Sequence, residues 1–309
     1  MITVGGFNTS MDELIELDEL SLGKVHRTTG VQAYPGGKGL HVATAVAALG
    51  EPVALVGLIE PGYRATFEEW LGARGVNFHG IEIEQPIRTC FAIREKSGRI
   101  TEILEAGPEI DARAEGELLA TFRKLADTSR VAVLSGSLPR GISEQTYAKL
   151  VESLGTRCIV DTSGEPLRHA IAAGPFMVKP NRDEAEKWLS MPIDGLEAAA
   201  AAAQRMAYEG IALVVVSLGD QGALAFSHGV CLHASVDIDA CINPVGSGDA
   251  LVGGMTVGLA RDWSFEATLR LGVACGAANA LTGETGFFRR EDVERLFHLV
   301  KVRTFPFSR

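Results

Sequence analysis

Short apolar runs recur along the chain between glycines. They lie at residues 52–58, 131–134, 158–161, 176–179 and 212–217. Runs without polar alternation are typical of strands that are covered on both faces. Helical stretches separate them, for example at residues 42–49, 144–154 and 196–208. This alternation of strand and helix predicts an α/β fold, with a mainly parallel sheet and helices on both of its faces.

Two segments near the N-terminus follow a different pattern. Residues 13–32 and 83–105 alternate polar and apolar positions, and the second contains a turn sequence at residues 96–99 (KSGR). Such alternation is typical of half-exposed antiparallel strands. We therefore predict one domain, residues 1–309, with a small second sheet that is inserted at about 13–32 and 83–105. This sheet would cover one end of the main sheet.

Composition and charge narrow the classes of function. The 309 residues include 29 Lys+Arg and 39 Asp+Glu, which gives a formal net charge of −10. Such an acidic chain argues against a nucleic-acid-binding surface, although it permits a local basic pocket for a small anion. The sequence shows neither a long apolar span nor a basic leader with an apolar core. Its five scattered cysteines fit reduced thiols, so we expect a cytoplasmic protein without a membrane partner.

The most informative motif lies at residues 243–254 (NPVGSGDALVGG). Gly246, Ser247 and Gly248 let backbone N–H groups converge where the chain enters a helix, which suits a phosphate or a developing anion. Asp249 at the start of that helix would lie beside the bound group. A carboxylate there can accept the proton of a hydroxyl group that attacks a phosphoryl group. A helix cap is the alternative role for Asp249.

The same motif excludes two other nucleotide-binding classes. Leu251 stands where the dinucleotide-binding motif GxGxxG has its third glycine, and GxxxxGK[ST] occurs nowhere in the chain. The sequence therefore lacks the motif expected of an NAD-dependent oxidoreductase.

Five motifs together resemble the ribokinase-like sugar kinases, also called the PfkB family. Besides the motif around Asp249, they are residues 35–43 (PGGKGLHVA), 135–139 (SGSLP), 179–184 (KPNRDE) and 217–223 (SLGDQGA). They stand in family order and span nearly the whole chain. The resemblance implies a three-layer α/β/α domain with a small β-sheet lid. It also implies an ATP-dependent carbohydrate kinase that uses ATP and Mg²⁺.

The resemblance assigns roles to individual residues. Asp249 would be the catalytic base, and the backbone of Gly246, Ser247 and Gly248 would form the anion hole. The sugar would contact Asp12, Gly36, Gly37, Gly39, His41 and Ser137. The nucleotide would contact Lys179, Asn181, Ser217, Gly219, Gly222 and Asn279, while Asn181 and Glu184 would orient Mg²⁺.

Alternative roles remain open for three of these side chains. They are a solvated loop carboxylate for Asp12, an exposed helix-start acid for Glu184 and helix packing for His41. The family usually carries asparagine at the position of His41, so the histidine leaves the substrate open. Histidine differs in donor geometry and can carry a charge near neutral pH.

The acceptor is expected to be a sugar phosphate. Residues 22–27 (LGKVHR), 87–89 (IRT) and 101–108 (TEILEAGP) resemble the branch with 1-phosphofructokinase, tagatose-6-phosphate kinase and 6-phosphofructokinase. A phosphorylated acceptor needs cations away from ATP. The candidates are Lys38, Arg88, Lys24 and Arg27, for each of which a solvated surface charge is the alternative.

We expect 1-phosphofructokinase activity, which converts fructose 1-phosphate to fructose 1,6-bisphosphate. Tagatose-6-phosphate kinase and 6-phosphofructokinase are the next alternatives. A kinase of an unphosphorylated sugar or nucleoside, and a non-catalytic sugar-phosphate sensor, remain open. The resemblance also suggests a homodimer through the lid.

Overall fold

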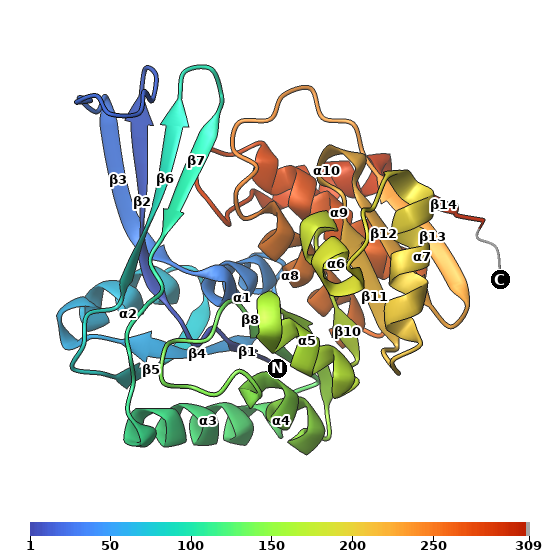
Figure 1. The fold of residues 1–309 in the computed structure, drawn as a ribbon, viewed down its shortest axis with the longest axis horizontal. Helices are drawn as coiled ribbons and strands as arrows, with labels where there is room; N and C mark the ends of the chain where they lie inside the picture. Colours follow the sequence, from blue (N-terminus) through green and yellow to red (C-terminus); the bar gives the residue numbers. More distant parts are fainter. Residues whose placement is uncertain (307–309) are drawn as a thin grey trace.

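The computed structural model describes residues 1–306, so residues 307–309 of the predicted domain lie outside the described residues. A 10-stranded sheet forms the centre, in the order β14-β13-β12-β11-β10-β9-β8-β1-β4-β5 (Figure 1). In chain order its strands are β1 (Ile2–Gly5), β4 (Val53–Ile59), β5 (Val76–Glu82), β8 (Val131–Ser135), β9 (Arg157–Asp161), β10 (Met177–Val178), β11 (Leu213–Ser217), β12 (Ala223–Ser227), β13 (Val230–Ser235) and β14 (Lys301–Thr304).

Most of this sheet is parallel, which confirms the predicted fold class. The strands from β5 to β11 in the sheet order pair in parallel, and the apolar runs of β4, β8 and β11 are buried. The other end differs, because β12, β13 and β14 pair antiparallel to their neighbours. The sequence pattern did not predict this antiparallel end.

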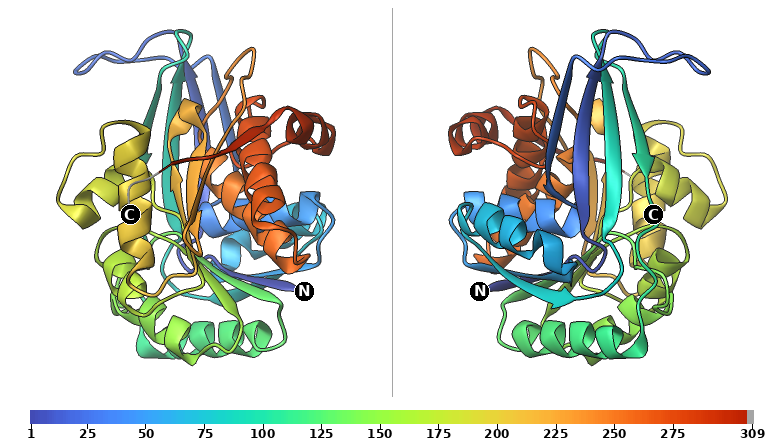
Figure 2. Two further views of the ribbon diagram at one scale, coloured as in Figure 1. Left: turned by 90° about the vertical axis from the view of Figure 1, so that its right-hand side faces the viewer. Right: turned by 90° about the vertical axis from the view of Figure 1, so that its left-hand side faces the viewer.

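Helices cover both faces of the main sheet (Figure 2). One face carries α1 (Lys38–Ala48), α2 (Arg64–Gly72), α8 (Ser247–Ala260) and α9 (Phe265–Ala280), with α10 (Arg290–Leu299) packed on α9. The opposite face carries α3 (Ala112–Ala126), α4 (Thr146–Ser153), α5 (Gly164–Ala172), α6 (Arg182–Leu189) and α7 (Gly195–Ala207). Two short 3₁₀ helices lie at Pro61–Tyr63 and Gly219–Gln221. Within residues 1–306, none of these helices combines the length and apolar character that a bilayer crossing requires.

The second sheet has four strands in the order β3-β2-β6-β7, and we call it the lid. Its strands are β2 (Ser10–Leu17), β3 (Gly30–Gly36), β6 (Arg88–Glu95) and β7 (Ile100–Leu104). Each hairpin is antiparallel, but β2 and β6 pair in parallel. The cause is that β2 follows β1 and β6 follows β5. Because β1 and β5 are parallel members of one sheet, both lid strands leave from the same edge.

The lid stands over the edge of the main sheet where the parallel strands end (Figure 1). Ser135, Asp161 and Ser217 are the last residues of β8, β9 and β11. In open α/β sheets, ligands bind outside the carboxyl ends of the strands. The fold therefore predicts a ligand-binding site at this edge of the main sheet.

Candidate active site

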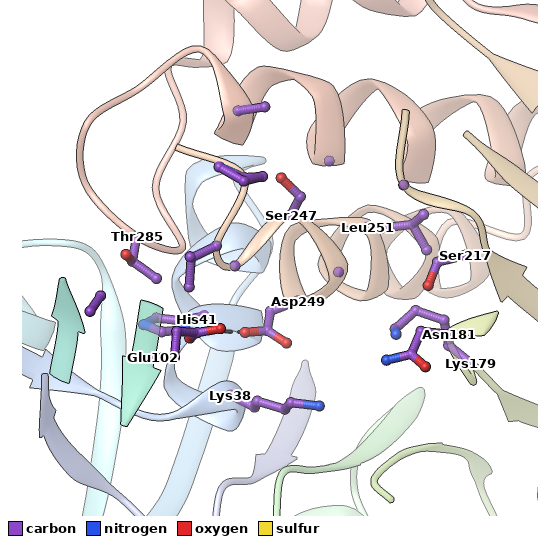
Figure 3. Close-up of a pocket in the computed structure, with 18 of the residues that line it drawn as sticks. Lys38, His41, Glu102, Lys179, Asn181, Ser217, Ser247, Asp249, Leu251 and Thr285 are labelled. Carbon is purple, nitrogen blue, oxygen red and sulfur yellow. Dashed lines mark hydrogen bonds and ion pairs between the residues drawn. The ribbon is translucent and has the colours of Figure 1, made fainter. Parts of the chain in front are cut away.

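A cavity of 1180 Å³ lies between the lid and the carboxyl edge of the main sheet. Small-molecule sites are usually about 300–1,000 Å³, so this cavity has room for two ligands. Figure 3 shows Asp249 between two groups of side chains. We call the side with Asp12, Arg88 and Glu102 the lid end, and the side with Lys179 and Ser217 the sheet end.

Asp249 lies in the first turn of α8 and is buried. The helix begins after Gly246, whose φ of 83° is left-handed and whose Cβ, if present, would lie 2.5 Å from the Gly286 nitrogen. No side chain of residues 1–306 caps this helix start with a hydrogen bond. Because first-turn N–H groups have no acceptor within a helix, those of Gly248 and Asp249 are suited to bind an anion. Asp249 itself does not cap α8: its Oδ2 contacts His41 Nδ1 at 3.1 Å.

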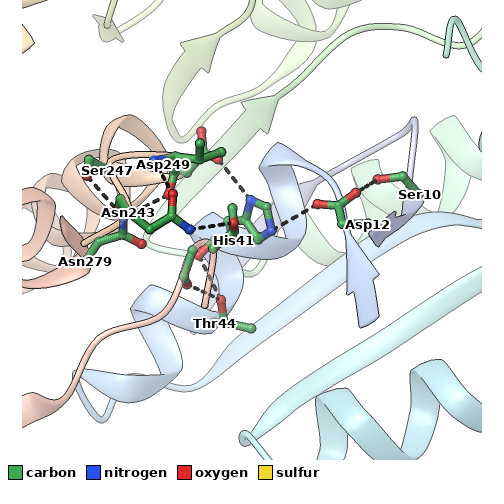
Figure 4. A network of polar contacts seen from close by, with 11 residues as sticks. Ser10, Asp12, His41, Thr44, Asn243, Ser247, Asp249 and Asn279 are labelled. Carbon is green, nitrogen blue, oxygen red and sulfur yellow. Dashed lines mark hydrogen bonds and ion pairs between the residues drawn. The ribbon is translucent and has the colours of Figure 1, made fainter. Parts of the chain in front are cut away.

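Two buried asparagines hold the loop before α8 in place (Figure 4). Asn279 of α9 donates from Nδ2 to the carbonyl oxygen of Val245 at 2.9 Å and to Ser247 Oγ at 3.1 Å. Its side chain is fully buried and lies outside the cavity lining. Asn243 accepts from the Val245 N–H at 3.0 Å and donates to Thr285 Oγ1 at 3.1 Å. The sequence analysis included Asn243 in the motif without giving it a role and did not single out Thr285, because only tertiary contacts reveal what the two residues do.

At the lid end, His41 lies between two carboxylates. Its Nε2 is 3.5 Å from Asp12 Oδ2, and Asp12 Oδ1 accepts from Ser10 Oγ at 2.6 Å (Figure 4). Asp12 occupies the space above Gly36, where a Cβ would lie 2.0 Å from the Asp12 Cγ. Glycine at position 36 is therefore required by the aspartate that lies over it.

The remaining glycines of the predicted sugar-binding motif differ in their surroundings. A Cβ at Gly39 would lie 2.3 Å from the Gly6 Cα, so this glycine lets α1 pack against the main sheet. Gly37 lines the cavity with a φ of 106°. Of the three glycines, Gly37 alone belongs to the cavity lining among the described residues.

Other predicted residues of the lid end also line the cavity. Arg88 donates from Nε to the Asn8 carbonyl oxygen at 3.1 Å, and Asn8 Nδ2 donates to Ser137 Oγ at 3.0 Å. The pKa of Lys38 lies above its ordinary value, chiefly because of the negative charge of Asp161. Lys24 and Arg27, by contrast, are exposed in the loop between β2 and β3 and lie outside the lining.

Glu102 of β7 is a lid-end residue that the sequence reading did not single out. It is accessible from the cavity, and its pKa is raised, first by partial removal from water and then by the charges of Asp249 and Asp12. The lid end therefore gathers several carboxylates around His41.

The sheet end is organised by a buried ion pair. Lys179 Nζ lies 3.2 Å from Asp161 Oδ1, and the two side chains are 5% and 0% exposed. A Cβ on Gly248 would lie 3.5 Å from Lys179 Nζ, so the ammonium group stands over the first turn of α8. The sequence reading missed Asp161, although a carboxylate at the end of a buried strand is a recognisable signal.

Asn181 and Glu184 form the start of α6. Asn181 Oδ1 accepts from the Glu184 N–H at 2.8 Å, and Glu184 Oε2 accepts from the Asn181 N–H at 2.9 Å. The capping box uses Oε2 of Glu184, so the other carboxylate oxygen, Oε1, takes no part in it. Asn181, Ser217, Gly219 and Gly222 line the cavity, and Glu184 lies outside the lining.

Among the described residues, no cluster of metal-binding side chains lines the cavity. Within residues 1–306, the cluster of three close metal-binding side chains is Glu144, Glu165 and His169, none of which lines the cavity. Mg²⁺ is usually held by one or two carboxylates together with the phosphates of a nucleotide. Because Glu184 lies outside the lining, a divalent ion in this cavity would have to arrive with the phosphates of a nucleotide.

Comparison with known proteins gives the class. The sequence matches the family described as pfkB family carbohydrate kinase over residues 6–291. The chain therefore belongs to this family of carbohydrate kinases. Kinases of the family use ATP with a divalent metal ion.

The fold is also similar to those of several solved structures. Phosphofructokinase-2 from Escherichia coli, in complex with substrates and products, is 28% identical, with a TM-score of 0.90 over 97% of this chain and 99% of that one. A possible 1-phosphofructokinase from Thermotoga maritima is 20% identical, with a TM-score of 0.88 over 99% of each chain. Ribokinase from the same organism is 20% identical, with a TM-score of 0.79 over 96% of this chain and 99% of that one. The last two show the ribokinase-like fold alone.

Proposed function

We propose that this chain transfers the terminal phosphoryl group of ATP to a hydroxyl group of a ketohexose monophosphate. The observation that carries the proposal is the start of α8, where an uncapped helix turn lies beside Asp249 and under the Lys179 ammonium. Asp249 accepts the proton of the acceptor hydroxyl. The turn of Gly246, Ser247 and Gly248 stabilises the charge on the transferred group with backbone N–H donors.

The lid end supports a phosphorylated acceptor. Arg88 lines the cavity there, and Lys38 lines it as well, although its charge interacts most strongly with Asp161 of the sheet end. A sugar phosphate needs cations separate from those on ATP. Asp12, Gly37 and Ser137 would orient the sugar hydroxyls. Lid closure over these residues would exclude water, which otherwise competes with the sugar as nucleophile.

For the cofactor we propose ATP with Mg²⁺ at the sheet end. Ser217, Gly219 and Gly222 offer backbone at the cavity wall, Lys179 faces the phosphates, and Glu184 would hold a metal-bound water. The bound ion would neutralise part of the negative charge of the ATP phosphates. Asn279 acts from outside the cavity by holding the α8 loop, rather than by touching the nucleotide.

The leading acceptor remains fructose 1-phosphate. Fructose 6-phosphate is the second candidate, favoured by the 28% identity to E. coli phosphofructokinase-2. The test is ATP-dependent ADP release with fructose 1-phosphate, fructose 6-phosphate, tagatose 6-phosphate and the unphosphorylated sugars. We expect turnover with one of the phosphorylated ketohexoses. Turnover limited to unphosphorylated sugars would contradict the proposed acceptor class.

We also propose that two copies pair through the lid. The strand register aligns Val31, Ile15 and Ile93 in one row and Phe91 with Ile103 in the next, on the sheet face opposite Asp12. Val31 and Ile103 are more than half exposed. Covering this apolar face with a second copy would also bury the loop that carries Lys24 and Arg27.

Sedimentation of the wild type and of the double variant Val31→Asp/Ile103→Asp tests this pairing. We expect a dimer for the wild type and a monomer for the variant. A wild-type monomer at the concentrations of the activity assay would contradict it.

The five cysteines are all free thiols, which supports the cytoplasm as the compartment.

A further inference from the structure

His41 is an ionisable side chain at a position where sugar binding alone requires none. It belongs to the first turn of α1 and is 5% exposed. Its two ring nitrogens face two carboxylates from other elements: Nδ1 lies 3.1 Å from Asp249 Oδ2, and Nε2 lies 3.5 Å from Asp12 Oδ2 (Figure 4). The ring thus connects the residue proposed to orient the sugar with the residue proposed to act as base.

The geometry favours the doubly protonated ring. A neutral imidazole carries one N–H group and one bare lone pair. In either tautomer, that lone pair would face a carboxylate oxygen. Only the imidazolium presents an N–H group to both partners. Nε2 is buried and forms no full hydrogen bond, so its contact with Asp12 is an ion pair that depends on the positive charge.

The groups that face His41 are predominantly acidic. They are Asp12 of β2, Glu102 of β7, Asp249 of α8 and Glu284 of the loop after α9. The Tyr34 phenol of β3 interacts with Asp12 and Glu284. Lys38 of the same helix interacts most strongly with Asp161 at the sheet end, and Arg74 pairs with Glu284 at 3.1 Å. Burial lowers the pKa of His41. The hydrogen bond with Asp249 and the charges of Asp12, Asp249 and Glu284 together raise this pKa by more than burial lowers it, so the net shift is upward.

The ring has little freedom to move away from these partners. A Cβ at Gly286 would lie 2.4 Å from the His41 ring, and Gly286 in turn packs against Gly246 at the start of α8. Thr44 Oγ1 donates to the His41 carbonyl oxygen at 2.9 Å. His41 is therefore fixed between β2, α8 and the loop after α9.

We propose that His41 acts as an imidazolium that holds Asp12 and Asp249 in fixed relation and offsets the carboxylates of the lid end, so that a phosphorylated acceptor can bind. The inference rests on the proposed function, and it makes His41 a positioning residue that also tunes acceptor specificity. During transfer the hydroxyl proton passes to Asp249, the bond from the acceptor oxygen to phosphorus forms and the bond to ADP breaks. His41 retains both of its protons throughout.

The charge of His41 can be measured without any turnover. In protein labelled with ¹⁵N-histidine, the resonance that disappears in His41→Asn identifies the ring, and His41→Gln provides a second assignment should the first variant fold poorly. Near pH 6.5, the ordinary midpoint of histidine, we expect this resonance to report an imidazolium. His79 and His233 are internal controls, because burial lowers the pKa of each, so both should be less protonated there than an ordinary histidine. A His41 resonance that is neutral at this pH would overturn the proposal.

Kinetics then separates positioning from simple packing. Asparagine keeps an N–H group toward Asp249 but carries no charge, so His41→Asn should raise the acceptor KM on the order of tenfold, with a smaller change in kcat and an unchanged KM for ATP. In the wild type, acceptor kcat/KM should fall as pH rises through the His41 pKa, because the raised pKa means that the charge is present below it and lost above it. The variant should lack this fall.

The control is His79→Asn on β5, which should keep the wild-type pH profile. Equal loss in kcat and in both KM values, with the pH profile unchanged, would reduce His41 to a packing role and overturn the proposal. Failure of the acceptor panel with an imidazolium resonance would instead contradict the proposed function and leave the charge state of His41 intact.

Discussion

Two helices begin at the wall of the same cavity, and their first turns differ. The start of α6 is closed by its own side chains, because Asn181 and Glu184 satisfy each other's backbone N–H groups. The start of α8 has a glycine at the cap position and no side-chain acceptor. A closed helix start is stable by itself, whereas an open one can bind an anion. The contrast indicates which of the two turns is available for a transferring phosphoryl group.

The largest expected effect comes from the carboxylate at the open turn. Asp249→Asn should lower kcat by about 10²–10⁴, the usual contribution of a general base. The amide has nearly the same shape and can still contact His41, so the melting temperature should stay close to that of the wild type. Steady-state ADP release and thermal melts check this. Activity near the wild-type level would remove Asp249 from the role of base.

The next effect concerns the cation over the open turn. Lys179→Met should remove the ion-pair partner of the buried Asp161 carboxylate and leave Lys38 as its nearby cation, which should destabilise the fold by about 1–3 kcal/mol, measured by urea unfolding. The double variant Lys179→Met/Asp161→Asn should recover part of that loss, because the buried negative charge is gone, although Lys38 loses its strongest partner. Both variants should keep a raised KM for ATP. A double variant with normal ATP affinity would show that the lysine serves only the ion pair.

A smaller effect is expected from closing the space around the open turn. Gly246→Ala places a Cβ in a left-handed conformation and against the Gly286 nitrogen. We expect a loss of about 1–3 kcal/mol in stability together with a lower kcat. The matched control is Gly116→Ala inside α3, where a Cβ meets nothing within 4 Å. That change should stabilise the protein slightly, since alanine is the better helix former.

The smallest effect tests the closed turn. Glutamine can replace glutamate in a capping box, so Glu184→Gln should change stability by less than about 0.5 kcal/mol. It removes the negative charge, and the Mg²⁺ concentration for half-maximal activity should rise severalfold. Asn181→Ala, by comparison, should cost about 1 kcal/mol of stability. An unchanged Mg²⁺ requirement in Glu184→Gln would limit the pair to capping.

The fold was predictable from the sequence because its signals are local. Continuous apolar runs located β4, β8, β9 and β11, and polar–apolar alternation located the lid strands. Strand β5 was missed because its sequence VNFHGIE is neither continuous nor cleanly alternating. The parallel pairing of β2 with β6 depends on which edge each strand leaves, and no local pattern contains that information.

The site was predictable where a motif concentrates it and not where distant residues meet. The turn before Asp249 could be identified from spacing alone. The contact of His41 with Asp249 joins residues 208 positions apart, and composition gives no hint of it. The capping box of α6 did have a local signal, an asparagine three residues before a glutamate. It agrees with the helix-start role that the sequence left open for Glu184, although the partnership with Asn181 was not predicted.

The pairing of β2 with β6 also has a consequence for the order of folding. Each lid hairpin is local, but Ser10 and Arg88, which pair in the lid, are separated by the chain that forms β3, α1, β4, α2 and β5. Contacts between distant residues form slowly, since the loop between them must close first. A refolding chain should therefore regain its helices and main sheet before the two hairpins join. Acceptor binding would return last, as the final step in the maturation of the enzyme.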